Sequence, residues 1–501
     1  MNQKKAGVLL SYFSEAIKIL SSLLYTPIVL RLLGQSEYGL YQLVYSVVGY
    51  LALLNLGFTG SYTRYYYKTK AEGTEEDVAN LNGMFMTVFL FITLVVAACG
   101  AVLVCNIHRV FSTGLLEEEY KTARILMIIM VFNLCITFPN SVYNCIISAQ
   151  EQFIFQRVLS LSMGLLGPLF EIPMLLMGYG SIGMALTTTA LRIIQIAINA
   201  WYVLVRLHTR FSFGHFDKLI FRDISRFTFF IFLNQIINQL NWNVDRFLLG
   251  RMIGTAAVAV YAVGANLNSL YVHYSSIISS VFAPQINRLV AERNDNHELS
   301  LLFTQVGRIQ FILLSLVLTG FVFFGKPFVR LWAGKNYGEA FYVALWLMVP
   351  ALVPQIQSLG IEIQRAKNKH QTRSIVYSLV SVGNVLISIP LIRRYGVIGA
   401  TIGTAIAITL GETLFLNWYY ARRIGLEIAE YWRQILRMLP ALALPVAAGL
   451  AIRHCVAIDG YLSLAVWAVL YTALFCVCMW LFGMNASEKK LVTNLTARFR
   501  R

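Results

Sequence analysis

The sequence predicts an all-α polytopic membrane protein with about fourteen transmembrane helices, and three observations lead to this fold class. Hydrophobic residues make up 57% of the chain and charged residues only 13%, against about 25% charged in a typical soluble domain. Apolar runs recur from end to end, and each is long enough to cross roughly 30 Å of hydrocarbon as a helix. The alternation of apolar and polar residues that marks the strands of an outer-membrane barrel is absent.

The apolar runs define the candidate helices in chain order. They cover residues 8–32, 38–62, 83–105, 122–148, 154–178, 180–204, 224–249, 255–281, 304–325, 340–364, 372–392, 395–420, 436–454 and 461–483. Every connection between them is short, and the longest has about 20 residues. The sequence therefore offers no domain outside the membrane in which a soluble type of active site would lie.

The charges predict how the helices are oriented. With the N-terminus inside, the cytoplasmic connections and tails hold roughly 27 Lys and Arg residues and the opposite face about 12. The even number of helices then places both termini in the cytoplasm. The net charge of +17 follows from this positive-inside bias, so we expect no nucleic-acid partner. The first apolar stretch carries Glu15 and Lys18 and leads to no cleavage site, which predicts a retained helix and not a signal peptide.

The seven cysteines lie mostly in apolar segments and lack the paired spacing of a zinc site. We expect buried structural thiols, no metal site and no cofactor. The two Asn-x-Ser/Thr matches, at Asn485 and Asn494, fall in a basic tail and are interpreted as chance.

An internal repeat divides the chain. GYGSIGMALTTTAL (residues 178–191) resembles RYGVIGATIGTAIA (residues 394–407), and the offset of about 216 residues also places residues 32–34 on 248–250 and 156–157 on 372–373. Six helices separate equivalent points, so the halves share one orientation and a pseudo-two-fold axis along the membrane normal. The repeat predicts an N-lobe at 1–205, a cytoplasmic inter-lobe linker at 206–223, a C-lobe at 224–420, and helices 13 and 14 with a basic cytoplasmic tail at 421–501.

The stretch FLNQIINQLNWNVDR (residues 232–246) places six amide side chains inside one apolar segment. Hydrogen-bonded contacts between helices would explain one or two of them, whereas six favour the wall of a wetted cavity. Positions i, i+4, i+7 and i+11 lie on one stripe of a helix. That stripe consists of Asn234, Asn238, Asn241 and Asp245, and the amides at Gln235, Gln239 and Asn243 are predicted to pack against neighbouring helices.

The first helix carries Glu15 and Lys18 on one face, followed by Ser22. Lys18 lies roughly 15 Å from the cytoplasmic end at 1.5 Å per residue. An ionisable side chain at that depth usually faces a bundle interior or a water-filled cavity, although a self-neutralising pair that locks helix packing is the alternative. Because the repeat aligns Asn234 with Lys18, we expect the two polar helices to face each other across a central cavity.

Other intramembrane charges are candidates for the same site. Lys18 and Arg64 would together attract a phosphate, or Arg64 serves only as a positive-inside anchor. Arg192 lies deeper in its helix. The carboxylates Glu171, Glu362 and Glu412 are candidates for carrying a coupling proton or sodium ion. The alternative for each is a carboxylate that pairs with a neighbouring helix or lies near the membrane interface. The small residues in the Gly399-x-x-x-Gly403 sequence predict close helix packing.

The segment RLLGQSEYGLYQLVYSVVGYLALLNLGFTGSYTRYY (residues 31–66), the short loops and the repeat together resemble the Wzx-type polysaccharide (O-antigen) flippases. These belong to the multidrug/oligosaccharidyl-lipid/polysaccharide (MOP) exporter superfamily, and the resemblance covers nearly the whole chain. It implies a multi-pass protein of the bacterial inner (cytoplasmic) membrane, with two lobes enclosing a cavity.

The resemblance also implies an activity. By alternating access, such a protein moves undecaprenyl-diphosphate-linked oligosaccharide repeat units from the cytoplasmic to the periplasmic leaflet, for O-antigen, capsule or exopolysaccharide synthesis. The implied partners are that lipid-linked oligosaccharide, membrane lipid, H+ or Na+ as a coupling ion, and a polysaccharide polymerase.

Three other functions compete with this one. A lipid II flippase of the MurJ type also has fourteen helices and a more arginine-rich cavity, an option that Arg64 and Arg192 leave open. A cation-coupled multidrug antiporter typically has twelve helices and an anionic or aromatic site. A membrane glycosyl-polymerase or ligase usually carries a large periplasmic loop, which this sequence lacks, so a transporter is expected and not an enzyme.

Overall fold

The computed structural model describes residues 3–55, 58–111, 115–213, 243–293, 295–369 and 371–490, together with positions 222, 224, 232, 235, 236, 239 and 493. Every regular element within these ranges is helical, which confirms the all-α class. The chain forms two compact units, Met1–Ala259 and Val260–Arg501. The lobe boundaries that follow from the repeat stay a prediction.

Among the described residues, ten helices are long and apolar enough to cross a membrane, or eleven if one bent pair counts as a span. The count of fourteen therefore stays a prediction. The segment at 224–249 falls mostly outside the described residues. Two predicted pairs of helices, 8–32 with 38–62 and 372–392 with 395–420, each meet at a kink without an intervening loop. Only one glycine in each pair departs from helical geometry, Gly34 with φ 76° and Gly396 with φ 61°. This left-handed backbone, which favours glycine, replaces the loop that we expected.

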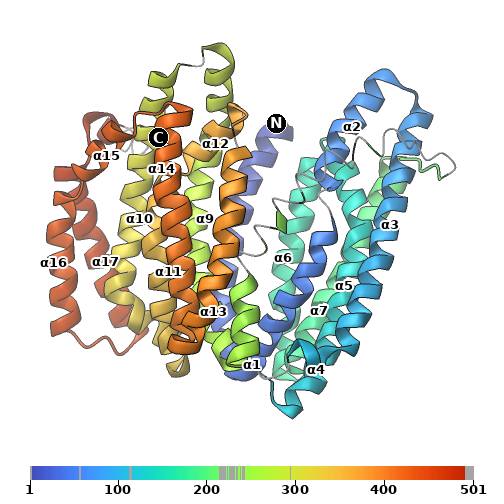
Figure 1. The fold of residues 1–501 in the computed structure, drawn as a ribbon, viewed down its shortest axis with the longest axis horizontal. Coiled ribbons are helices and arrows are strands. Elements are labelled where there is room, and N and C mark those ends of the chain that lie inside the picture. The colour runs from blue at the N-terminus through green and yellow to red at the C-terminus, as the bar shows by residue number, and fades with distance from the viewer. Residues whose placement is uncertain are drawn as a thin grey trace. The chain divides into compact units, whose positions relative to one another are not determined.

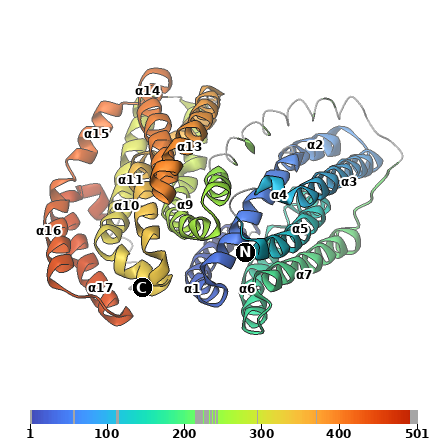
Figure 2. The same ribbon diagram turned by 60° about the horizontal axis from the view of Figure 1, so that its bottom comes forward.

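The first unit is built around three neighbouring helices, with α5 packed against both α3 and α7 (Figures 1 and 2). Helix α6 packs against α1 and α7. The elements are α1 (Gln3–Leu51), η1 (Ala52–Asn55), α2 (Phe58–Glu72), α3 (Glu75–Cys105), α4 (Ile107–Val110), α5 (Glu117–Ala149), α6 (Phe153–Leu176), α7 (Gly180–Trp201) and the π-helical η2 (Tyr202–Arg206).

The C-terminal end predicted for the helix at 38–62 is wrong. Helix α1 ends at Leu51 and a tight 3-10 turn follows, before α2 begins at Phe58. Apolar residues continue through this turn, so hydropathy did not reveal it, although such turns are frequent at helix ends.

The second unit packs α10 against α11, and the C-terminal pair α16 and α17 against α10. Its elements are α9 (Thr255–Glu292), which begins in the first unit, α10 (Asn296–Trp332), η3 (Lys335–Tyr337), α11 (Gly338–Ile356), α12 (Leu359–Ala366) and α13 (Gln371–Ala407). They continue with the π-helical η4 (Ile408–Phe415), α14 (Leu416–Tyr419), η5 (Tyr420–Ile424), α15 (Ile428–Leu436), α16 (Pro440–Cys455), α17 (Tyr461–Cys478) and the π-helical η6 (Met479–Gly483).

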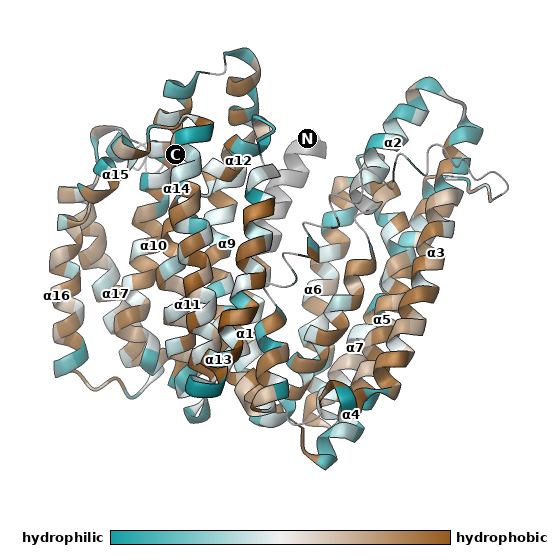
Figure 3. Ribbon diagram, in the orientation of Figure 1, coloured by the Kyte–Doolittle hydropathy of each residue, from teal (hydrophilic) through white to brown (hydrophobic). Residues whose placement is uncertain are grey.

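Several helices extend beyond their apolar runs. Helix α3 starts eight residues before the predicted run, and Thr74 and Asp77 form a capping box at its start. The Asp295 side chain caps α10 by accepting a hydrogen bond from the backbone N–H of His297 at 2.8 Å. Figure 3 shows hydrophobic residues along the middle of such helices and hydrophilic residues at many of their ends. Hydropathy marks the apolar part of a helix, whereas its ends are set by these polar caps.

Only part of the cysteine prediction holds. Cys145 and Cys478 are buried, but four others are exposed on the protein: Cys99, Cys105, Cys455 and Cys476. In a membrane protein, apolar side chains can face lipid as well as the protein interior, so an apolar neighbourhood does not establish burial.

The repeat agrees with the geometry at one pair of equivalent positions. Gly180 and Gly396 both have positive φ, 55° and 61°. Gly180 is the first residue of α7, and Gly396 lies at the kink inside α13. Three residues later, Gly399 faces the preceding segment so closely that a Cβ atom would overlap the carbonyl oxygen of Leu391. Gly403 is equally close to the Ser388 hydroxyl. These contacts confirm the close packing predicted for Gly399-x-x-x-Gly403.

We predict that Gly399→Ala destabilises the protein by roughly 1–3 kcal/mol, because the added methyl group must push the Leu391 backbone away. Gly383→Ala is the matched control, since Gly383 lies in the same α13 helix with no atom within 4 Å of the added Cβ. It should be neutral or slightly stabilising. Thermal unfolding of the two purified variants in one detergent measures the difference, and equal unfolding temperatures would contradict the packing argument.

Candidate functional site

The first unit contains a cavity of about 230 Å³ inside its bundle of helices. Helices α1, α5 and α7 line it with a mixture of hydroxyl, amide, aromatic and cationic side chains. The lining residues are Tyr41, Tyr45, Val48, Gly49, Ala52, Met130, Asn133, Leu134, Thr137, Ala185, Thr188, Thr189 and Arg192. The cavity thus offers several hydrogen-bond donors and acceptors together with one permanent positive charge.

Arg192 supplies that positive charge. The sequence predicts this residue deep in a transmembrane segment. It lies twelve residues after Gly180 on α7, about 18 Å along the helix at 1.5 Å per residue. Its Nη1 donates a hydrogen bond of 3.0 Å to Oε1 of Gln195. Among the described residues, no carboxylate lies within ion-pair distance of Arg192. A guanidinium at this depth that faces a cavity and lacks a carboxylate partner is suited to bind an anion.

Glu171 lies beside this cavity and is held by hydroxyl groups. Tyr25 donates a hydrogen bond to Oε2 of Glu171, and Thr188 donates one of 2.9 Å to Oε1. Thr188 also lines the cavity and lies in hydrogen-bond contact with Tyr41. The carboxylate is therefore connected to the cavity through a single threonine side chain.

The remaining residues predicted in the first helices are more scattered. Ser22 on α1 and Arg64 on α2 are exposed. The side chains of Glu15 and Lys18 lie outside the described residues, as do Asn234, Asn238 and Asn241. The structure therefore leaves the predicted pairing of the two polar helices as a prediction.

The described part of the amide-rich segment contacts α1. The amide nitrogen of Gln239 would lie 2.6 Å from a Cβ atom on Gly49, and that of Asn243 would lie 4.0 Å from it. This close approach agrees with the packing role predicted for Gln239 and Asn243. Asp245 is fully buried, close enough to Tyr50 for electrostatic interaction.

The two other candidate carboxylates lie in the second unit. Glu362 forms an ion pair of 2.8 Å with Arg365 in its own helix α12 and not with a neighbouring helix. Glu412 lies in the π-helical η4, where it forms a hydrogen bond with Tyr377 and interacts with Arg373. The Arg373 guanidinium lies over the Tyr377 ring, 4.7 Å from its centre. π-Helical segments are frequent at functional sites, so Glu412 stays a candidate for ion coupling.

Sequence reasoning missed most of the cavity lining. Asn133 and Thr137 are spaced i, i+4 on α5, and Thr188 and Arg192 are spaced i, i+4 on α7. The helical spacing that identified the stripe at Asn234 could have found these pairs. Asn133 also donates a hydrogen bond of 3.3 Å to the Thr189 hydroxyl, which joins α5 to α7 at the cavity.

The residues that carry the family resemblance have a structural role. Glu37 accepts hydrogen bonds from the backbone and side chain of Ser181, at 2.6 and 2.7 Å, and so caps the start of α7. Ser36 contacts the Thr255 hydroxyl at 2.9 Å, and both donate to Glu119. A Cβ atom on Gly39 would overlap the Thr255 carbonyl oxygen. The LLG-x-x-x-YG motif thus joins the starts of three helices.

A buried ion pair fixes the C-terminal segment of the second unit. Arg308 on α10 donates two hydrogen bonds to Glu488, of 2.6 and 2.9 Å, and two more to the carbonyl oxygens of Gln434 and Gly483. Asn485 and Glu488 also cap each other's backbone at 2.9 Å. The first Asn-x-Ser match is therefore explained as a helix cap.

The sequence profile of the family described as "Polysaccharide biosynthesis protein" matches residues 5–290, more than half of the 501 residues. The chain belongs to this family. One relative of this chain is the Shigella flexneri protein named "Putative O-antigen transporter". It is 22% identical over 426 residues, which cover 82% of this chain and 96% of the relative.

Two solved structures resemble this member of the polysaccharide biosynthesis family in fold. The lipid II flippase MurJ in its inward closed conformation superposes with a TM-score of 0.76 at 15% identity, covering 95% of this chain and 98% of MurJ. An inward-facing MATE multidrug transporter of the MOP superfamily superposes with a TM-score of 0.65 at 15% identity. The match covers 82% of this chain and 96% of the MATE transporter. These likenesses show that the chain has a MurJ/MATE-like fold. The named relatives are transporters, in agreement with the expectation of a transporter and not an enzyme.

Proposed function

We propose that this protein is a flippase for undecaprenyl-diphosphate-linked oligosaccharide repeat units in the bacterial inner membrane. It moves their head groups from the cytoplasmic to the periplasmic leaflet by alternating access, for surface polysaccharide synthesis. The observation that carries this proposal is the cavity at Arg192, in a chain that belongs to the polysaccharide biosynthesis family. The name of the Shigella relative supports the same class of substrate.

The chemistry of the cavity fits part of such a head group. The hydroxyls of Thr188 and Thr189 and the amide of Asn133 can exchange hydrogen bonds with sugar hydroxyls, and Tyr41 and Tyr45 provide aromatic surface. Arg192 can donate two parallel hydrogen bonds to a phosphate. The volume of about 230 Å³ is below the roughly 300–1,000 Å³ of pockets for drug-sized ligands. The cavity therefore has room for one sugar ring or one phosphate group.

Such a cavity addresses the physical obstacle to translocation. Burying a single unpaired charge in hydrocarbon costs tens of kcal/mol by Born estimates, and a diphosphate carries more than one negative charge. A cationic, hydroxyl-rich surface inside the bundle replaces part of the lost hydration, while the lipid tail stays in the bilayer. No covalent bond needs to change.

Proteoliposomes test the proposal against its alternatives. The purified protein should translocate undecaprenyl-diphosphate oligosaccharide, detected by loss of access to an external glycosidase. Lipid II and an organic cation such as ethidium are the comparison substrates. Transport of lipid II at an equal or higher rate would favour the MurJ-type function, to which the fold likeness and Arg192 also point. Transport of the cation alone would favour the multidrug antiporter.

We predict that Glu171→Gln removes the dependence of translocation on an imposed H+ or Na+ gradient, because the amide cannot release a proton and binds a cation weakly. The wild type should slow when the gradient is collapsed, whereas the variant should translocate at one low rate with or without it. Glu362→Gln is the control, since Glu362 is already paired with Arg365 in its own helix. A gradient dependence that persists in Glu171→Gln would exclude this carboxylate as the coupling group.

A further inference from the structure

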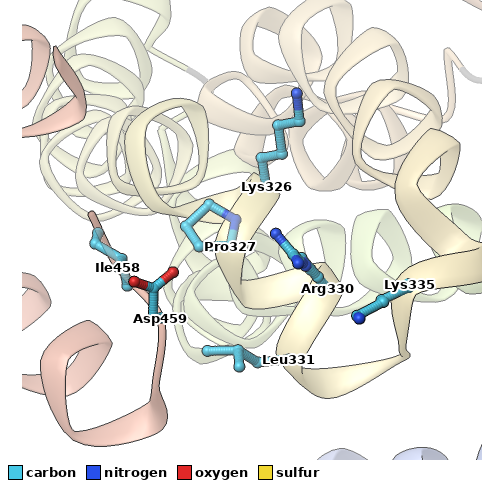
Figure 4. A pocket seen from close by; sticks show the side chains of 7 residues that line it. All are labelled: Lys326, Pro327, Arg330, Leu331, Lys335, Ile458 and Asp459. Atoms are coloured by element: carbon cyan, nitrogen blue, oxygen red, sulfur yellow. The ribbon is translucent and has the colours of Figure 1, made fainter. Parts of the chain in front are cut away.

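A second cavity, of about 390 Å³, lies at the C-terminal end of α10 in the second unit. Figure 4 shows its lining: Arg330 comes from α10, Lys335 from η3, and Asp459 from the loop before α17. The lining residues are Lys326, Pro327, Arg330, Leu331, Lys335, Ile458 and Asp459. Three cations and one carboxylate therefore surround one hollow, far in sequence from Arg192 and Glu171.

The three cations have no ion-pair partner in the part of the chain that the structure describes. Lys326 and Arg330 are four residues apart on one helix face, an arrangement in which like charges repel each other. The helix dipole favours a cation in the last turn, which explains Arg330. It does not explain Lys326, which lies before the last turn, or Lys335, which lies beyond the helix. A bound anion would offset the repulsion among all three.

The base of the cavity is apolar. Leu331 and Ile458 pack against a buried cluster formed by Phe323, Phe324, Leu464 and Tyr471. The Tyr461 hydroxyl donates a hydrogen bond of 2.6 Å to the carbonyl oxygen of Leu331, which ties the start of α17 to α10. Trp332, stacked on Phe328, and Tyr461 are of the aromatic types that gather at the border between membrane and water. Positive charge thus lies next to apolar surface at one end of transmembrane helices.

We propose that this cavity, which we call the α10 pocket, binds the phosphate head group of an anionic membrane lipid. Arg330 can contact a phosphate through two parallel N–H groups, and Lys326 and Lys335 add compact point charges. The apolar base suits the glycerol and upper acyl carbons of a lipid better than a fully hydrated inorganic anion. By the positive-inside bias this end of α10 faces outward, where Lys and Arg are sparse. That bias therefore does not account for three cations here.

The test uses the full-length protein in detergent and native mass spectrometry, with phosphatidylglycerol, phosphatidylcholine, glycerol 1-phosphate and inorganic phosphate as probes. Wild-type protein should retain phosphatidylglycerol in preference to the other three. The double variant Lys326→Gln, Arg330→Gln should bind phosphatidylglycerol at least about tenfold more weakly. The matched control removes one arginine and one lysine from exposed positions of the first unit, Arg109→Gln and Lys121→Gln, and should bind as the wild type does.

A third variant changes the affinity in the opposite direction. Asp459→Asn removes the one carboxylate among the described residues that line the α10 pocket, so phosphatidylglycerol should bind more tightly. Equal binding by the two double variants would overturn the proposal. Binding of glycerol 1-phosphate or inorganic phosphate as tightly as phosphatidylglycerol would overturn its lipid part and identify a soluble anion instead. Unchanged thermal unfolding of the Lys326→Gln, Arg330→Gln variant verifies that its loss of binding is local.

Discussion

Replacing Glu488 with alanine is expected to destabilise the protein by about 3–5 kcal/mol, because it leaves a buried arginine without its counter-ion. Arg308 and Glu488 have only 6% and 3% of their side-chain surface exposed, so water does not replace the lost carboxylate. The Arg308 guanidinium would keep only its bonds to two carbonyl oxygens. The C-terminal segment should then separate from α10.

Two measurements check this expectation in purified protein. The apparent unfolding temperature should fall, and trypsin should cleave after Lys489 and Lys490 faster than in the wild type. Glu430→Ala is the matched control, since Glu430 pairs with Arg433 at 3.8 Å on an exposed surface and such pairs contribute about 0–1 kcal/mol. The double variant Arg308→Met, Glu488→Leu should recover much of the loss, because an apolar pair needs no counter-ion. Unchanged cleavage and unfolding in Glu488→Ala would show that the pair does not hold this segment.

Arg192→Gln is expected to reduce translocation of the lipid-linked oligosaccharide at least about tenfold. A hydrogen bond to a charged group contributes roughly 1.5–3 kcal/mol, and each 1.4 kcal/mol corresponds to about a factor of ten. Arg192→Lys keeps the charge but loses the two parallel donors, so it should fall between the wild type and Arg192→Gln. Translocation in proteoliposomes and surface polysaccharide in cells both measure the effect.

The control for this prediction is Arg124→Gln, which removes an exposed arginine from α5 in the same unit, away from the cavity. It should translocate at the wild-type rate with the same amount of protein in the membrane. Wild-type rates in Arg192→Gln would remove the cavity from the transport path. They would also leave the family membership and the fold unaffected, because neither depends on that residue.

Part of the candidate site was predictable because burial of charge in hydrocarbon is costly wherever it occurs. Arg192 and Glu171 were identified from their depth in apolar segments alone, and the structure places both at one cavity or beside it. Thr188 and Asn133 were not identified, because a single hydroxyl or amide in a membrane helix is inexpensive and common. Only their convergence from α5 and α7 distinguishes them.

Ion pairs between residues far apart in the sequence could not be predicted either. Arg308 and Glu488 are separated by 180 positions, and neither stands in a pattern that points to the other. Glu362 and Arg365, three positions apart on one helix, show the contrasting case, in which helical geometry alone predicts the contact.

By itself, the sequence determined the helical membrane fold, the internal repeat and the presence of charged groups at depth. These follow from local physics, since about 20 apolar residues must form a hydrogen-bonded helix wherever they lie in a bilayer. The tertiary structure alone decided where two helices meet at a kink without a loop. It also decided which hydroxyl groups line the cavity with Arg192 and which cation forms an ion pair with Glu488. Those outcomes depend on side chains that come together from helices distant in sequence. The spacing of residues along one helix does not predict such contacts.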